Sequence, residues 1–275
     1  MLAVSGPPYD TLEEVIGLRE AREASDTPPE DTQEPTARTR WARGLLGTLK
    51  EFQIDYGAVD LRGDGRFDLE AIDRTLDEDE EAREIRMLHV QRSCGYSSRR
   101  SIPIKEIKRL MDHIRERYPH RHGRDLMVFA DNCYGEFVEA LEPTHVGVDL
   151  IAGSLIKNPG GGLAPSGGYI AGRRPYVRAA MSRLAAPGVA GGAALGQHWR
   201  LYQGLFLAPT VVGESLKGAH LMAEVLGGEM GLECRPGPHS RDPRPRTDII
   251  QSVRLGSRDR AVKFCRAVQR MSPVD

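Results

Sequence analysis

The sequence lacks long apolar runs and a charge excess of either sign. No apolar stretch approaches the roughly 18–20 residues that a membrane-spanning helix needs. No charged start followed by an apolar segment and a cleavage site is visible either, so we expect neither a membrane protein nor a signal peptide. Lys and Arg total 38 against 39 Asp and Glu, a net charge of -1. This balance argues against a nucleic-acid-binding protein, which relies on neutralising phosphates.

Cysteine is also scarce. The four cysteines, Cys94, Cys133, Cys234 and Cys265, lie far apart and form no CxxC pair. We therefore expect no zinc site and no disulfide framework, and we predict a reducing, cytoplasmic setting. The histidines show no metal-like spacing, so we expect no metal site.

The composition is that of an ordered protein. Hydrophobic residues make up 40% of the 275 residues and charged residues 28%, enough apolar material for a sizeable core. A polar, proline-bearing stretch at about residues 20–43 predicts a flexible surface insertion. The acidic run at residues 77–81 predicts a solvated helix face.

Periodicity predicts an α/β fold with a mostly parallel central sheet flanked by helices. Short apolar runs separated by amphipathic stretches are typical of parallel strands buried on both faces. The predicted strands are residues 2–4, 85–90, 126–130, 148–152 and 247–255. Predicted helices begin after an N-cap at Thr11, carry the apolar stripe Ile104, Ile107, Met111 and Ile114, and cover residues 212–226 and 258–270.

Two candidate site segments follow predicted strands. Asp131 ends the apolar run 126–130, and the segment from Ser154 to Lys157 follows the run 148–152. In open α/β sheets, ligands gather beyond the carboxyl ends of the strands. These segments are therefore the first place to look for chemistry.

Three interpretations of Lys157 compete. It is a surface lysine of a loop, a phosphate-binding lysine, or a desolvated lysine that forms a Schiff base. A phosphate-binding loop needs glycines before the lysine and Ser or Thr after it. Here Asn158 and a glycine run follow the lysine, so nucleotide binding is the weakest of the three.

Asp131 has two interpretations. A strand-terminal Asp is commonly a turn former or a helix cap. Alternatively, its carboxylate holds a proton on the ring nitrogen of a cofactor such as pyridoxal phosphate, which needs that partner to act as an electron sink.

Taken together, the two segments resemble the pyridoxal-phosphate enzymes of fold type I. Asp131-Asn132 followed by Ser154-x-x-Lys157 carries that likeness. Residues 8–17, 131–139, 153–172 and 203–209 are similar to the methionine gamma-lyase-like family often labelled aluminium resistance protein. The resemblance covers nearly the whole chain outside the insertion.

The resemblance implies a role for four residues. Lys157 would hold pyridoxal 5′-phosphate through a Schiff base and shuttle substrate protons. Asp131 would pair with the pyridinium nitrogen. Ser154 would bind the cofactor phosphate, and Tyr9 would stack on the pyridine ring.

The resemblance also implies an organisation and an activity. Residues 1–195 would form an N-terminally incomplete cofactor-binding large domain. Residues 196–275 would form a linking helix and part of a small C-terminal domain, so that the chain is truncated at both ends relative to the family. The implied function is a carbon–sulfur lyase acting on a sulfur-containing amino acid, in a homodimer or homotetramer, with no nucleic-acid or membrane partner. An aminotransferase using the same Lys157 and Asp131, and a non-catalytic remnant, stay open as alternatives.

Overall fold

The computed structural model describes residues 1–18, 47–184 and 198–272. The chain divides into two compact units. Unit 1 comprises Met1–Cys133, Leu141–Ser154 and Gly168–His198, and unit 2 comprises Tyr134–Ala140, Leu155–Gly167 and Trp199–Asp275. The predicted insertion at about residues 20–43 lies outside the described residues, and the predicted boundary near residue 195 stays a prediction.

Unit 1 is built on one six-stranded sheet, which confirms the predicted α/β class with a mostly parallel sheet. The strand order is β2-β1-β3-β4-β5-β6, and all neighbours pair in parallel except β5 and β6. The strands are β1 (Leu2–Ala3), β2 (Gly57–Ala58), β3 (Met87–Gln91), β4 (Met127–Asp131), β5 (Leu150–Ser154) and β6 (Gly168–Gly172). The four predicted strands of this unit are thus present, each within about two residues of its predicted bounds.

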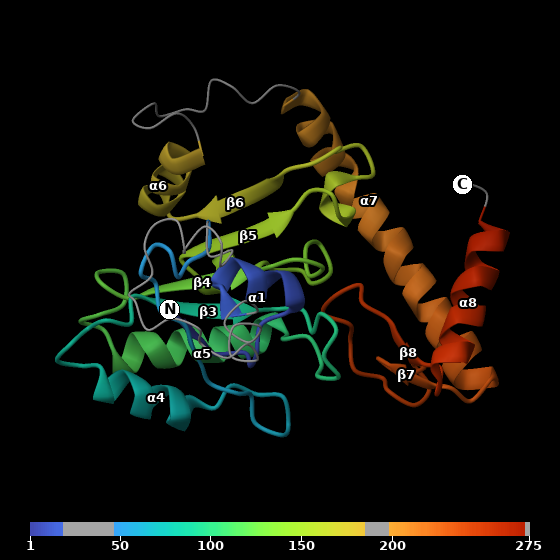
Figure 1. The fold of residues 1–275 in the computed structure, drawn as a ribbon, viewed down its shortest axis with the longest axis horizontal. Coiled ribbons are helices and arrows are strands. Elements are labelled where there is room, and N and C mark those ends of the chain that lie inside the picture. Colours follow the sequence, from blue (N-terminus) through green and yellow to red (C-terminus); the bar gives the residue numbers. More distant parts are fainter. Residues whose placement is uncertain (19–46, 185–197, 273–275) are drawn as a thin grey trace, which may run out of the picture. The chain divides into compact units, whose positions relative to one another are not determined.

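The core of unit 1 lies between the sheet and the helices α4 (Leu69–Glu78) and α5 (Ile104–Arg117) (Figure 1). The predicted apolar stripe forms the buried face of α5, where Ile107, Met111 and Ile114 are fully buried. They pack with strand residues in one apolar cluster. At the N-terminus of α4, the Asp68 side chain accepts a hydrogen bond from the backbone N–H of Ala71, which satisfies one of the free donors of the first turn.

Further short helices complete unit 1. They are α1 (Asp10–Ile16), the 3-10 turn η1 (Pro143–Val146) and α6 (Arg174–Leu184). The predicted N-cap at Thr11 is wrong: α1 begins one residue earlier, and Tyr9 is its N-cap without a side-chain capping bond. Pro8 and the glycine at Gly17, where φ is +83°, confine the helix to seven residues.

The acidic run at residues 77–81 is only partly a solvated helix face. Helix α4 ends at Glu78, and Asp79 turns inward with a side chain 10% exposed. Its carboxylate binds the fully buried Arg121 guanidinium at 3.1 Å and accepts the backbone N–H groups of Glu84 and Ile85. The prediction failed here because a buried arginine elsewhere in the chain needed a charged partner.

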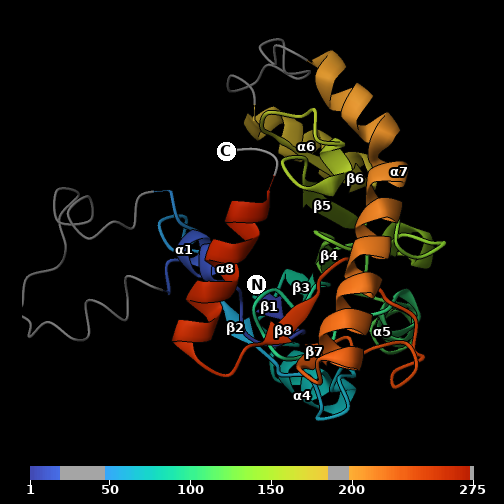
Figure 2. The same cartoon turned by 90° about the vertical axis from the view of Figure 1, so that its right-hand side faces the viewer.

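Unit 2 is mostly helical. It contains the 3-10 turn η2 (Asn158–Gly160), the helix α7 (His198–Met222), its π-helical continuation η3 (Ala223–Glu229) and α8 (Arg258–Met271). The short antiparallel strands β7 (Glu233–Arg235) and β8 (Ser252–Arg254) pair with one another. In both views β7 lies beside η3 (Figure 1 and Figure 2). The two predicted helices of this unit are confirmed, with α7 starting earlier than expected.

The predicted strand at residues 247–255 is wrong over its first half. Only Ser252–Arg254 is a strand. The Asp248 side chain accepts the backbone N–H of Ile250 in a tight turn. The guanidinium of Arg246 donates to the carbonyls of Ile250 and Ala219, and these local bonds replace strand pairing.

Within the described ranges, every helix is either too short or too polar to cross a membrane.

The packing of α5 predicts where unit 1 is sensitive to truncation. Ile107→Ala removes fully buried methyl groups and should lower the free energy of unfolding by about 2–5 kcal/mol. Lys105→Ala, on the exposed side of the same helix, should change it by less than about 0.5 kcal/mol. Urea unfolding followed by circular dichroism compares the two variants, and equal losses would contradict this core assignment.

Candidate functional site

Asp131 is the last residue of β4, at the carboxyl edge of the parallel strands. Hydrogen-bonded register places it opposite Gln91 on β3 and opposite Ala152 on β5. Asp131 is half-buried, and alternation along β4 turns its side chain away from the core face that Val128 and Ala130 occupy. The structure therefore presents this carboxylate where the sequence predicted it.

The carboxylate of Asp131 is held on both oxygens. The Tyr9 hydroxyl donates to Oδ2 at 3.2 Å, and the backbone N–H of Cys133 donates to Oδ1 at 3.0 Å. Tyr9 comes from the turn before α1, 122 positions earlier in the chain. The structure thus brings together two of the four predicted site residues; the predicted stacking of Tyr9 on a cofactor stays a prediction.

A buried polar network adjoins Asp131. The Arg92 guanidinium, fully buried after β3, donates to Asn132 Oδ1 at 2.8 Å and lies 3.4 Å from Glu142 Oε2. The Asn132 amide nitrogen donates to Glu142 Oε2 at 2.9 Å and to the Tyr169 hydroxyl at 3.1 Å. The network joins the ends of β3 and β4 to β6 and stiffens this edge.

Sequence reasoning found only part of this network. Asn132 was singled out because it directly follows Asp131 in the motif that carries the family resemblance. Glu142 and Tyr169 carried no local signal, because their partners lie 10 and 37 positions away.

His89 lies on β3 beside this face and is 3% exposed. Its ring stacks on Phe129, with centroids 5.6 Å apart and planes at 20°. Burial lowers the pKa of His89 to about 4, although the Asp131 charge acts in the opposite direction. The imidazole is therefore neutral near pH 7, so His89 places no positive charge beside the Asp131 carboxylate.

Ser154 ends β5 at the same edge as Asp131. It pairs in the antiparallel ladder with Gly168 of β6 and is half-buried. A side chain at position 168 would place its Cβ 2.9 Å from the Gly153 carbonyl oxygen. Glycine is required here because β6 approaches the β5 backbone closely.

Lys157 belongs to unit 2. It is half-buried as the N-cap of η2, and its Nζ lies over the Tyr134 ring, 4.4 Å from the centroid. This cation–π contact gives the ammonium form a partner. Along the chain, Lys157 follows Ser154 by three residues, as Tyr134 follows Asp131.

The loop that carries Tyr134 has a strained backbone. Tyr134 and Phe137 have φ values of +70° and +62°, in the left-handed region that side chains disfavour. Each costs about 1 kcal/mol or more and persists only where the surroundings impose it. Strain of this kind clusters at functional sites, so this loop of unit 2 is a candidate for a functional role.

The glycine run after Lys157 has a packing role within unit 2. A Cβ at Gly160 would collide with the Leu155 carbonyl, and one at Gly161 would collide with the backbone of Gly204 on α7. The observed close approach of Gly160 and Gly161 is to the chain's own backbone.

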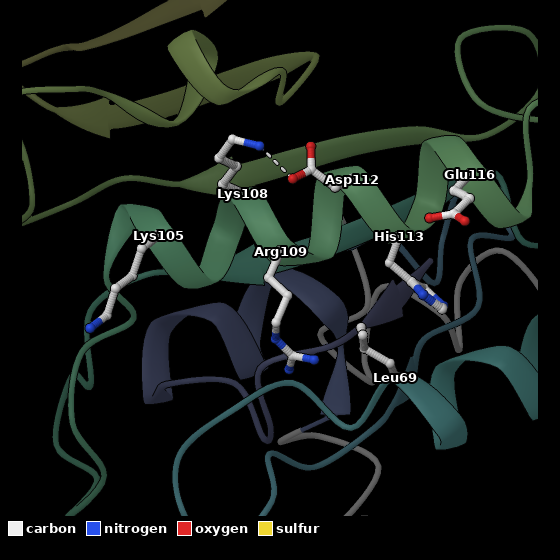
Figure 3. A pocket seen from close by; sticks show the side chains of 7 residues that line it. All are labelled: Leu69, Lys105, Lys108, Arg109, Asp112, His113 and Glu116. Carbon is white, nitrogen blue, oxygen red and sulfur yellow. Dashed lines mark hydrogen bonds and ion pairs between the residues drawn. The ribbon is translucent and has the colours of Figure 1, made fainter.

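A shallow hollow of about 350 Å³ lies on the exposed side of α5 (Figure 3). It contains no predicted site residue. Several of its charged side chains form ion pairs with neighbouring residues. Lys108 pairs with Asp112, and His113 pairs with Asp73 of α4 at 2.8 Å. Elsewhere among the described residues, no cluster of three or more His, Cys, Asp or Glu side chains has the arrangement of a metal site.

The chain matches a known family over its full length. The family model for methionine gamma-lyase matches residues 1–275. The uncharacterized protein YnbB of Bacillus subtilis (strain 168) is 42% identical over 277 residues, which cover 100% of this chain. This chain spans only 57% of the length of YnbB.

Solved structures show the same likeness. A carbon–sulfur lyase involved in aluminum resistance from Clostridium novyi NT is 40% identical, with a TM-score of 0.79 over 100% of this chain and 57% of that chain. A structure from Listeria innocua, also named for involvement in aluminum resistance, is 42% identical, with a TM-score of 0.78 over 100% of this chain and 58% of that one. A structure from Campylobacter jejuni that contains N′-pyridoxyl-lysine-5′-monophosphate shares the fold alone, at 15% identity and a TM-score of 0.50 over 79% of this chain and 57% of that one.

The buried neutral His89 predicts a pH dependence of stability. Its pKa falls from 6.5 in the unfolded chain to about 4 in the folded one, so the unfolded state binds more protons between these values. The contribution is fully present above pH 6.5 and is lost as the pH falls toward 4, with about 2 kcal/mol lost between pH 7 and pH 5. Urea unfolding at both pH values measures it.

The matched control is His89→Phe, which keeps an aromatic ring next to Phe129 but does not titrate. Its loss of stability between pH 7 and pH 5 should be smaller than that of the wild type by the same amount. An identical loss in both proteins would show that His89 is not held neutral.

Proposed function

The chain belongs to the methionine gamma-lyase family, and from this premise we propose that it is a pyridoxal-phosphate-dependent carbon–sulfur lyase of fold type I that acts on a sulfur-containing amino acid. The observation that carries the proposal is the Asp131 carboxylate. It stands at the carboxyl edge of β4, between Gln91 and Ala152, with both oxygens hydrogen-bonded.

The chemistry of the residues present supports this cofactor. Pyridoxal phosphate needs a carboxylate for its ring nitrogen, a lysine for its aldehyde and donors for its phosphate. Tyr9 and Cys133 hold the Asp131 carboxylate in place through hydrogen bonds. Each carboxylate oxygen can accept more than one hydrogen bond, so Asp131 can accept a further one from the cofactor. Lys157 supplies the amine and Ser154 a hydroxyl.

When bound, the cofactor supplies an electron sink for the negative charge that develops at the substrate's α-carbon. The Asp131 carboxylate would accept the hydrogen bond of the ring nitrogen and so hold a proton on that atom. Because the buried His89 imidazole is neutral near pH 7, it would not compete with the ring nitrogen for the Asp131 carboxylate.

Lys157 would carry the proton transfers. Its Nζ would hold the cofactor, and the same amine would accept the proton of the substrate's α-carbon. The Tyr134 ring, 4.4 Å from Nζ, would stabilise the ammonium that results. A positioned acid–base group of this kind contributes roughly 10²–10⁴-fold to a rate.

The proposal also covers the substrate class, the assembly, the cellular location and the role of the C-terminal region, as the family implies. The substrate is a small amino acid rather than a nucleic acid or a membrane component. The assembly is a homodimer or homotetramer in the cytoplasm, with residues 196–275 contributing a linking helix and part of a smaller domain.

Covalent labelling tests the role of Lys157. After incubation with pyridoxal phosphate and reduction with borohydride, peptide mapping should find the pyridoxyl label on Lys157. The label should be absent in Lys157→Ala, and turnover of cystathionine to a thiol and a keto acid should fall at least about 10²-fold.

Lys217→Ala is the control, because Lys217 is an exposed lysine of unit 2 that pairs with Glu214. It should retain both label and turnover. Label persisting in Lys157→Ala would refute the assignment, and keto acid formed without thiol would indicate an aminotransferase.

Two substitutions separate the possible roles of Tyr9. Tyr9→Phe keeps the ring and removes only the hydroxyl that binds Asp131, so it should lower turnover by about 2–10-fold, the value of one hydrogen bond, with cofactor affinity nearly unchanged. Tyr9→Ala should also weaken cofactor affinity. Cofactor titration and steady-state assays measure both, and a fully active Tyr9→Phe would limit Tyr9 to stacking.

A further inference from the structure

A second hollow in unit 1 lies at the amino ends of β4 and β5. Its volume is about 560 Å³, and its charged lining comprises Arg115, His122, Arg124, Asp149 and Arg173. His122 and Arg124 precede β4, Asp149 precedes β5, and Arg173 follows β6. Because β6 runs antiparallel to β5, with Gly172 opposite Leu150, these segments meet at one edge of the sheet.

This edge is the opposite one from Asp131 and Ser154. Asp149 and Ser154 are five positions apart along β5 and the residue before it, which corresponds to roughly 16 Å at the rise of a strand. The hollow is therefore distinct from the carboxyl edge, and its role is independent of the proposed lyase chemistry.

The floor of the hollow is a buried carboxylate with a donor on each oxygen. Asp149 is 1% exposed, and its Oδ2 accepts the backbone N–H of Val128 at 2.8 Å. The Arg173 guanidinium binds Oδ1 at 3.0 Å, and His122 Nε2 lies 3.3 Å from Oδ2. Burial alone would raise the pKa of Asp149, but these hydrogen bonds outweigh it and hold the pKa below its usual value. Asp149 is thus charged and fixes Arg173 at the floor.

Two further arginines stand over this floor without a carboxylate. In the part of the chain that the structure describes, neither Arg115 nor Arg124 forms an ion pair. The lining thus combines three arginines with one aspartate, an excess of about two positive charges when His122 is left out of the count. An excess of that size fits a dianion.

Glycines let the guanidinium groups lie against the backbone. The Arg115 group occupies the place that a side chain at Gly147 would take, and Arg173 Nη1 lies 2.7 Å from the Cβ position of Gly123. Both glycines also have positive φ values, +102° and +75°. Arg115 and Arg173 therefore lie against these two turns.

We propose that this hollow binds an anion of the phosphate class that carries two or more charges, such as the phosphate group of a small metabolite or inorganic pyrophosphate. Guanidinium forks match the spacing of phosphate oxygens, and the Thr144 hydroxyl, also in the lining, adds a neutral donor. Arg115 and Arg124 are the ligand-binding residues, and Asp149 is a positioning residue that holds Arg173.

Isothermal titration calorimetry with inorganic pyrophosphate tests the proposal. The wild-type chain should bind it, more weakly as salt rises. The double variant Arg115→Ala/Arg124→Ala should bind at least about tenfold more weakly, because charge-assisted hydrogen bonds are lost. Arg124→Glu alone should weaken binding further than Arg124→Ala, and since position 124 is exposed, this variant should fold.

Two controls locate the bound ion. Arg74→Ala removes an exposed arginine of α4 outside the hollow, and Ser154→Ala removes the hydroxyl proposed for the cofactor phosphate. Both should bind pyrophosphate within about twofold of the wild type, as expected for distant sites. Loss of binding in Ser154→Ala, unchanged binding in the double variant, absence of binding in the wild type, or equal affinity for citrate would each overturn the proposal.

Discussion

The candidate site depends on the parallel register of β3, β4 and β5. Strands that run in parallel and pair residue by residue end at one edge, so Gln91, Asp131 and Ala152 lie side by side. The Tyr9 hydroxyl and the Cys133 N–H then fix both oxygens of the Asp131 carboxylate. A shift of one residue in β4 would turn Asp131 toward the apolar core. The position of the Asp131 carboxylate therefore depends on the strand register.

A buried arginine holds this edge of the sheet in place. Arg92 is fully buried, and its contacts with Asn132 and Glu142 link the ends of two strands. A buried charge is costly unless it is fully paired, and removing one partner typically costs several kcal/mol. A network that is costly to disturb, next to a half-buried carboxylate, suits a site whose carboxylate must not move during a reaction.

Much of this could be predicted from the sequence, and the reasons are local. The unbroken apolar runs predicted β3, β4 and β5, and the stripe through Ile107 predicted α5 with its buried face. The position of Asp131 followed directly from the end of such a run. Lys157 and Ser154 came from their spacing and from the family resemblance, and their cofactor contacts remain proposals.

What could not be predicted depends on contacts between distant segments. The Tyr9 hydroxyl meets Asp131 across 122 positions, and nothing local distinguishes it from any other tyrosine. Thr247 to Leu255 is rich in apolar and β-branched residues, yet Asp248 and Arg246 form side-chain bonds to the backbone that replace most of the strand. Strand propensity depends on the residue type alone, whereas the Tyr9 contact and the loss of the strand depend on which distant or neighbouring groups each residue meets.

A crystal structure of this chain grown with pyridoxal phosphate tests the central claim most directly. The account predicts density continuous from the Lys157 side chain into the cofactor, with the ring nitrogen hydrogen-bonded to the Asp131 carboxylate. Cofactor density attached to another lysine, or a ring nitrogen facing away from Asp131, would contradict it.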